Sequence, residues 1–231
     1  RGRPIDGFDM PERRQRVLLV DMKLSDEQFR RRYSVEKPDG TFKAYRESEN
    51  LMRGRPHAPE NLCEWLRATV IEERISVVMI DDVSELRSTY DGTRELLRTV
   101  RELKRLQREL EISVLLIASS REPGRKGIIS ERELLRSRVL CDVADAAFSI
   151  AIHPRDASWR YLLQTRSAAG QLEWTADNPP NCRLQREPNG FLGFAFDDRF
   201  GPQYEEELRR DIVLIKSQHD QGESVRWLAE E

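Results

Sequence analysis

Few cysteines and histidines occur in the sequence, and their spacing excludes several kinds of site. Among the 231 residues the cysteines Cys63, Cys141 and Cys182 lie far apart and form no Cys-x-x-Cys pair. This spacing predicts neither a zinc site nor a disulfide framework, and it fits a reducing compartment such as the cytoplasm. The three histidines are isolated from one another, which favours surface or loop positions over metal ligation.

Long apolar runs and a strong net charge are also lacking. No stretch of about 18 apolar residues occurs, so we expect no membrane-spanning helix, and we find no signal-peptide pattern. The formal net charge is −2, so no overall positive field points to nucleic acid. Local basic clusters lie at residues 13–16 and 30–32, and we favour solvated helix faces over nucleic-acid contacts for both.

The motif Gly-x-x-x-x-Gly-Lys-[Ser/Thr], which binds nucleotide phosphates through backbone N–H groups and a lysine, is absent from the sequence. The chain begins with Arg1 rather than Met, and it ends at Glu231 within an apolar-periodic helix. We therefore expect a fragment of a longer protein or a trimmed chain.

Apolar runs alternate with amphipathic segments over the first two thirds of the chain. The runs predict buried strands at 17–22, 77–81, 112–119 and 146–152. The amphipathic segments predict helices at 25–33, 60–74 and 93–111, and short helices at 130–145. Strands alternating with helices favour a parallel, doubly wound α/β sheet. Residues 34–59 are rich in Pro and Gly, which predicts a loop or an irregular insertion.

The pattern changes after residue 152. A strand at 160–166 and a hairpin of 182–187 with 191–196 predict an antiparallel extension. A charged helix at 203–221, a turn at Gly222 and a helix starting at Ser224 have the spacing of a partial helix-turn-helix, with a plain helical hairpin as the alternative. We divide the chain into a linker at 1–16, a core at 17–200 and a helical part at 201–231.

Acidic residues end two of the expected parallel strands. Asp21 ends the strand at 17–22, and Asp81 and Asp82 end the strand at 77–81. Open α/β sheets bind ligands at the carboxyl ends of their strands, where nucleotide hydrolases hold Mg²⁺ with such an Asp. The third strand ends in the small polar residues Ser119 and Ser120, where a group that senses a phosphate could lie. The alternative for each acid is a strand-end residue that caps a turn.

Several segments together resemble one family. VLLVDMKLSDEQFRRRY, VVMIDDVSELRS, LLRSRVLCDVADAAFSI, RYLLQTRSAAG and PNGFLGFAFDDRFG are similar, in this order, to core segments of RecA-superfamily ATPases of the RepA type from plasmids and mobile elements. The resemblance covers about residues 17–200. It implies a RecA-like fold with ATP and Mg²⁺ as cofactors, and it implies that the phosphate-binding loop lies upstream of the first strand.

The resemblance also implies roles for single residues. Asp81 would hold Mg²⁺ with Asp82 beside it, and Ser119 or Ser120 would contact the γ-phosphate. Lys23 stands where the family has its catalytic Glu, and a charged lysine cannot accept a proton from water. Asp21, two residues earlier, would be the remaining acid for that step.

Further basic residues would contact a neighbouring subunit or DNA. Arg166 would act as a finger on the nucleotide of a neighbouring subunit in a homo-oligomeric ring, with a surface arginine as the alternative. Arg121, Arg125 and Lys126 would contact single-stranded DNA in a channel, unless their loop is an ordinary surface loop. The helical tail would contact duplex DNA.

The sequence thus predicts an ATPase core that acts on DNA in the replication or maintenance of a plasmid or mobile element. A non-hydrolysing DNA-binding or regulatory subunit on the same fold is the alternative, because of Lys23 and the serines at 119 and 120. A decayed gene copy is a third reading, and the intact apolar periodicity of the core elements argues against it.

Overall fold

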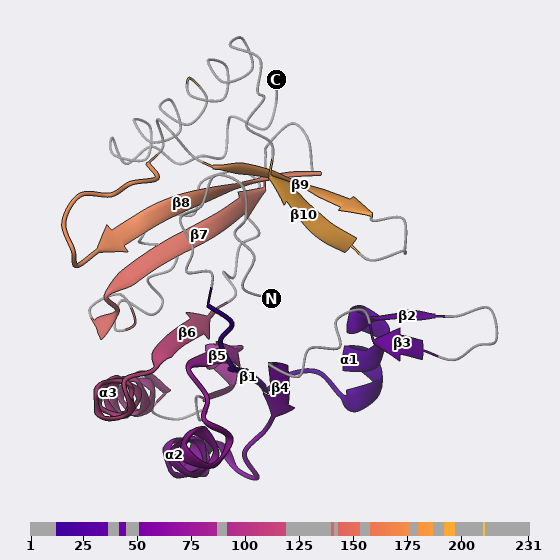
Figure 1. Ribbon diagram of the computed structural model, residues 1–231. Coiled ribbons are helices and arrows are strands. Elements are labelled where there is room, and N and C mark those ends of the chain that lie inside the picture. Colours follow the sequence, from indigo (N-terminus) through magenta and orange to yellow (C-terminus); the bar gives the residue numbers. More distant parts are fainter. Residues whose placement is uncertain are drawn as a thin grey trace. The chain divides into compact units, whose positions relative to one another are not determined.

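The computed structural model describes residues 13–36, 42–44, 51–86, 92–118, 140, 143–152, 158–175, 180–186, 192–196 and 210. These residues fall into two compact units, each with its own sheet (Figure 1). The first unit holds a parallel sheet with its helices, and the second holds an antiparallel sheet.

The parallel sheet has the strand order β4-β1-β5-β6. Its strands are β1 (Val17–Asp21), β4 (Leu51–Gly54), β5 (Val77–Asp81) and β6 (Ser113–Ile117). Every neighbouring pair is parallel, and Val17 is in register with Leu51 on one side and Val77 on the other. The apolar runs that the sequence assigned to parallel strands form β1, β5 and β6, so the prediction of these three parallel strands is confirmed.

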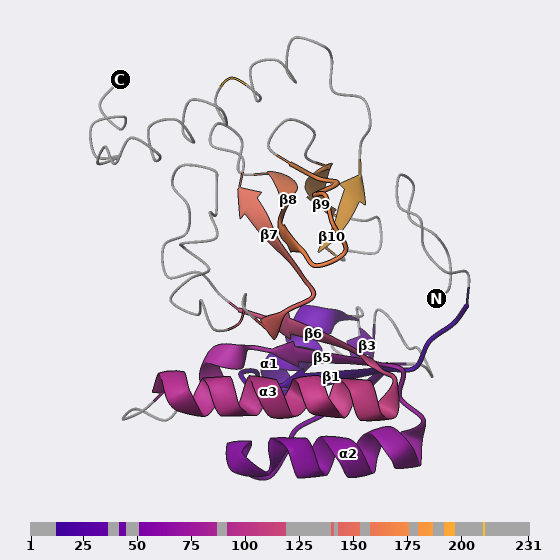
Figure 2. The same cartoon turned by 90° about the vertical axis from the view of Figure 1, so that its left-hand side faces the viewer.

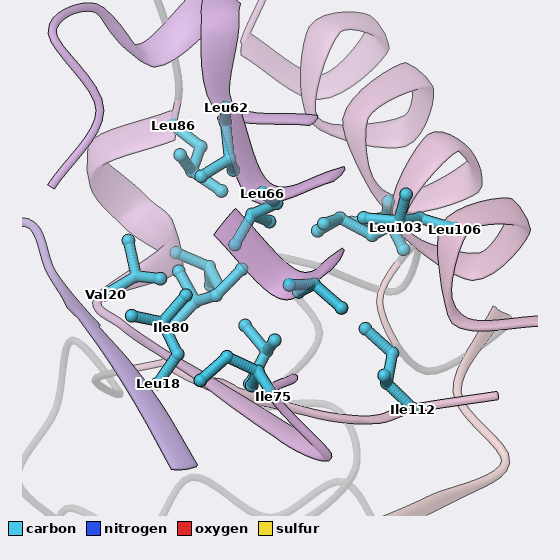
Figure 3. Close-up of a cluster of buried hydrophobic side chains, with 14 of the residues drawn as sticks. Leu18, Val20, Leu62, Leu66, Ile75, Ile80, Leu86, Leu103, Leu106 and Ile112 are labelled. Atoms are coloured by element: carbon cyan, nitrogen blue, oxygen red, sulfur yellow. The ribbon is translucent and has the colours of Figure 1, made fainter. Parts of the chain in front are cut away.

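Two helices lie side by side on one face of this sheet (Figure 2). They are α2 (Leu62–Glu73) and α3 (Gly92–Leu110), and the 3-10 turns η1 (Pro59–Asn61) and η2 (Val83–Leu86) precede them. Their apolar faces and the sheet enclose one core (Figure 3), formed by Leu18, Val20, Leu62, Leu66, Val70, Ile75, Val78, Ile80, Val83, Leu86, Leu96, Val100, Leu103, Leu106 and Ile112. The helical periodicity of these positions in the sequence explains why both helices pack on the sheet.

The helix α1 (Asp26–Tyr33) follows β1 and begins with the capping box that the sequence predicted. The N–H of Gln28 donates to Oγ of Ser25 at 3.2 Å, and the N–H of Ser25 donates to Oε1 of Gln28 at 2.9 Å. Two backbone donors at the start of the helix are therefore satisfied reciprocally. This cap fixes where the chain turns from β1 into α1.

The prediction of a loop or irregular insertion at 34–59 was wrong in part. The structure places three short strands there, β2 (Ser34–Glu36), β3 (Phe42–Ala44) and the sheet strand β4. Such short strands depend on pairing, β2 with β3 and β4 with β1, and not on a local apolar pattern. A Cβ on Gly54 of β4 would lie 2.8 Å from Cζ2 of Trp65, so glycine lets β4 approach α2.

The second unit has the strand order β10-β9-β8-β7. Its strands are β7 (Ala146–Ile152), β8 (Trp159–Ser167), β9 (Asn181–Arg186) and β10 (Leu192–Phe196). The antiparallel extension that the sequence predicted is confirmed by the antiparallel pairing of β8 with β9 and by the neighbouring β10.

The assignment of 146–152 to the parallel sheet was wrong, because β7 pairs antiparallel with β8. Only a short connection joins Ile152 to Trp159, and a parallel crossover needs a dozen residues or more. An apolar run predicts a strand without specifying its partner.

Other predictions fall outside the described residues. They concern most of the helical segment at 130–145, and the helix-turn-helix tail apart from Arg210. The division at residues 16 and 200 stays a prediction. Within the described part of the chain, no helix is both long enough and apolar enough to cross a membrane.

Candidate functional site

Two acidic residues meet at the carboxyl edge of the parallel sheet. Asp21, the last residue of β1, is in register with Asp81, the last residue of β5. Asp81 is in turn aligned with Ile117 at the end of β6. The backbone also joins the two ends, since the N–H of Met22 donates to the carbonyl of Asp81 at 2.7 Å. The sequence predicted this convergence, and the register confirms it.

Asp82 is buried and bound to a lysine from the neighbouring strand end. Its side chain has 0% exposed surface, and its Oδ2 accepts a hydrogen bond of 2.8 Å from Nζ of Lys23. The hydrogen bond to Asp82 raises the pKa of Lys23 above its usual value, aided by the nearby charges of Asp82, Glu85 and Asp81. The lysine is therefore charged at neutral pH, and it compensates the buried carboxylate.

Asp21 is also buried, and the described structure engages both of its carboxylate oxygens. Oδ1 accepts hydrogen bonds from the backbone N–H groups of Lys23 and Leu24, at 3.1 and 2.9 Å. Oδ2 accepts from Nε of Arg53 at 3.1 Å, and Nη2 of Arg53 lies 3.0 Å away. Asp21 thereby fixes the turn that carries Lys23.

Two arginines that no sequence pattern singles out complete this turn. Arg53 of β4 donates from Nη1 to Asp26 and from Nη2 to the carbonyl of Leu24, at 2.5 and 2.8 Å. Its guanidinium also lies over the ring of Phe29, 4.2 Å from the centroid. Arg55 donates to the carbonyls of Asp21 and Leu24, at 2.7 and 2.8 Å.

Only the pairing of β4 with β1 brings these arginines to the turn. In the sequence they lie among the Pro and Gly residues of the segment read as a loop. No local signal in that segment distinguishes them from other surface arginines.

The strand ends fit Mg²⁺ only in part. Mg²⁺ is commonly held by one or two carboxylates together with phosphate oxygens and water. Asp81 has a partly exposed side chain and can supply one carboxylate. Asp82 is enclosed and paired with Lys23, so it is not open to a cation in this arrangement. No group of three or more His, Cys, Asp or Glu among the described residues could hold a metal ion.

The remaining candidate residues lie either in the second unit or outside the described residues. Arg166 belongs to the second unit, where its Nε donates to the carbonyl of Ala144 at 3.0 Å. Its role as a finger stays a prediction. The other candidates lie outside the described residues, namely Ser119, Ser120, Arg121, Arg125 and Lys126.

Comparison with known proteins identifies the fold. No protein-family model and no curated protein sequence matches the chain. Among solved structures, it is similar to a KaiC-like protein of the hyperthermophilic archaeon Pyrococcus horikoshii, with a TM-score of 0.52 and 12% sequence identity. The match covers 78% of this chain and 76% of that protein. This similarity confirms the RecA-like α/β fold that the sequence predicted, and at this identity it shows the fold alone.

Proposed function

We propose that this chain is the RecA-like core of an ATPase of the RepA type, which acts on DNA in the replication or maintenance of a plasmid or mobile element. The observation that carries the proposal is the register of Asp21 with Asp81 at the carboxyl edge of a parallel sheet. Ligands of open α/β sheets bind at this edge. The similarity to a KaiC-like protein supports the fold on which the proposal rests.

In this proposal Asp81 supplies a carboxylate to Mg²⁺, and the phosphates of ATP and water complete the coordination. ATP binding would also need a phosphate-binding loop, and the motif for such a loop is absent from this sequence. Because both oxygens of Asp21 are bonded to its own turn and to Arg53, its geometry favours a positioning role over activation of water.

The proposed partners are DNA and further copies of the chain in a ring. Single-stranded DNA would contact Arg121, Arg125 and Lys126, and Arg166 would reach the nucleotide of the adjacent subunit. The proposed compartment is the cytoplasm.

The test is magnesium-dependent ATP turnover in the complete protein. Asp81→Asn keeps the shape of the side chain and removes its charge, so we expect turnover to fall to background. Glu72→Gln, on the exposed side of α2, removes one charge away from the edge and is the matched control. Equal turnover in the two variants would contradict the proposal.

The Lys23–Asp82 pair favours a second candidate, a non-hydrolysing DNA-binding or regulatory subunit. A protonated lysine cannot act as a general base, and its bond to Asp82 holds it in that state. Lys23→Glu in the complete protein separates the two candidates. A steep rise in turnover from a low value would identify a silenced site, whereas a high wild-type turnover that this change leaves untouched would exclude the second candidate.

A further inference from the structure

Five arginines lie along one side of α3. They are separated by four, three, four and three residues along the helix. The five residues are Arg94, Arg98, Arg101, Arg105 and Arg108. With about 100° of rotation per residue, this spacing confines them to an arc of about 80°. We call this set the α3 arginine stripe. It spans about 21 Å along the helix at a rise of about 1.5 Å per residue.

The stripe faces away from the core. The buried residues of α3 are Leu96, Val100, Leu103 and Leu106, and their mean direction on the helix is nearly opposite that of the stripe. All five arginines are exposed, and the side chains of Arg98 and Arg105 keep 83% and 73% of their accessible surface. The stripe therefore makes no contribution to the packing that holds α3 on the sheet.

The acidic residues of α3 lie on one flank of the stripe. Glu109 pairs with Arg67 of α2, and Glu102 lies near Cys63 of α2, so this flank faces the neighbouring helix. Glu102 and Glu109 also pair with Arg98 and Arg105, each at 3.2 Å. Exposed ion pairs of this kind are weak, so a phosphate can displace them.

The local charge contrasts with that of the whole chain. Residues 92–110 contain six basic and three acidic side chains, which gives α3 a net charge of +3, whereas the chain has −2. Five of the six basic residues are arginines, whose planar fork binds phosphate oxygens with two hydrogen bonds. A membrane-binding helix would alternate its basic residues with exposed apolar ones. Four arginines of the stripe line an open hollow, and Leu97 is the one apolar residue in its lining.

We propose that the α3 arginine stripe binds the phosphate backbone of DNA. The length of about 21 Å corresponds to the rise of about six base pairs. Such contacts would be independent of base sequence and sensitive to salt. The choice of DNA over another polyanion rests on the proposed function, while the stripe itself rests on the geometry of α3.

The test compares two triple variants of the full chain with equal charge. One carries Arg98→Gln, Arg101→Gln and Arg105→Gln, since glutamine keeps a good helix propensity. The control carries Arg13→Gln, Arg14→Gln and Arg30→Gln, which are exposed arginines of the two other basic clusters. Fluorescence anisotropy with a labelled random duplex of about 30 base pairs gives Kd at several salt concentrations between about 50 and 200 mM.

We expect the stripe variant to bind at least about tenfold more weakly and to lose about two to three units of the salt slope. The control should stay within about threefold of the wild-type affinity, because its arginines are not arranged in one stripe. Equal losses in both variants, or no loss in the stripe variant, would overturn the proposal.

Two further measurements keep the result interpretable. Glu95→Gln with Glu102→Gln raises the net charge of α3 and should tighten binding several-fold, which tests the stripe even if the triple variant fails to fold. Vesicles of phosphatidylserine and phosphatidylcholine serve as a second polyanion. If the stripe variant loses vesicle binding and keeps DNA binding, the assignment to DNA is wrong. ATP turnover is scored separately, so loss of the proposed ATPase activity leaves the DNA result standing, and the reverse holds as well.

Discussion

The ammonium of Lys23 donates a 2.8 Å hydrogen bond to a carboxylate oxygen of Asp82, a side chain with no exposed surface. The two residues come from the ends of adjacent parallel strands, β1 and β5. A buried carboxylate without a partner is unfavourable, so the lysine compensates the carboxylate of Asp82, which lies beside the candidate metal ligand Asp81. The ion pair between Lys23 and Asp82 therefore determines whether the Asp82 carboxylate can bind a cation at the edge of the sheet.

Removal of Lys23 should destabilise the fold. Lys23→Met leaves Asp82 buried without its cation, and we expect a loss of about 1–3 kcal/mol, reduced from the value for a fully buried pair because the lysine is partly exposed. Urea unfolding measures the loss of unfolding free energy. Lys104→Met on α3 is the control, because it removes the same charge elsewhere. The double variant Lys23→Met with Asp82→Asn should recover part of the loss. Equal stabilities of the two single lysine variants would show that the pair contributes nothing.

The same pair predicts a pH dependence of stability. The pKa of Lys23 in the folded protein is raised above the usual 10.5, mainly by its hydrogen bond to Asp82. Its contribution is therefore complete below about pH 10.5 and is lost as the pH rises through the folded-state pKa. The difference in unfolding free energy between wild type and Lys23→Met, measured from about pH 8 to 12, should shrink at the alkaline end. A difference that stays constant over this range would contradict the assignment.

Arg53 should be needed for its planar shape as well as its charge. It binds Asp21, Asp26 and the carbonyl of Leu24 with separate guanidinium nitrogens. Arg53→Lys keeps the charge but cannot make all of these bonds, so we expect about 1–2 kcal/mol of destabilisation and faster amide exchange at Lys23 and Leu24. Arg30→Lys, on the exposed side of α1, is the control. Unchanged amide exchange rates at Lys23 and Leu24 would mean that Asp21 stabilises the turn without Arg53.

Gly54→Ala should overpack the contact between β4 and α2. The added Cβ would lie 2.8 Å from Cζ2 of Trp65, closer than two carbons approach without a shift. We expect a loss of about 1–3 kcal/mol in unfolding free energy. Trp65→Leu in the Gly54→Ala background removes the clashing ring and should lower the cost of the alanine. If Gly54→Ala lowers the unfolding free energy equally with Trp65 and with Leu at position 65, the destabilisation comes from the backbone of β4 and not from the contact with the ring.

The thiol of Cys63 should react slowly with alkylating reagents. Burial raises its pKa to about 11, and the nearby Glu102 adds to the shift. Since the thiolate is the nucleophile, its fraction at pH 8 is about 100-fold lower than for a thiol of pKa 9. Iodoacetamide labelling followed by peptide mass spectrometry should show slow modification of Cys63 in the folded protein, and faster modification in urea. Glu102→Gln should raise the labelling rate of the folded protein; an unchanged rate would leave burial as the sole cause.

The sequence by itself determined the core elements of the first unit. The apolar runs that end at Asp21 and Asp81 predict strands of a parallel sheet, and the capping box at Ser25 is a local interaction over three residues. The parallel α/β sheet and the convergence of the strand-end acids follow from this order of elements, since parallel strands place their carboxyl ends at one edge. The RecA-like fold was predicted from the resemblance of the core segments to a known family.

Only the tertiary structure decided which residues surround these acids. Arg53 reaches Asp21 because β4 pairs with β1, and Lys23 reaches Asp82 because β1 pairs with β5. Neither contact has a local signal, since 32 residues separate the first pair and 59 the second. The assignment of β7 to the parallel sheet was wrong for the same reason, because its apolar run does not show that it pairs with β8. Periodicity specifies which face of an element is buried, whereas pairing between distant strands decides which polar side chains share a site.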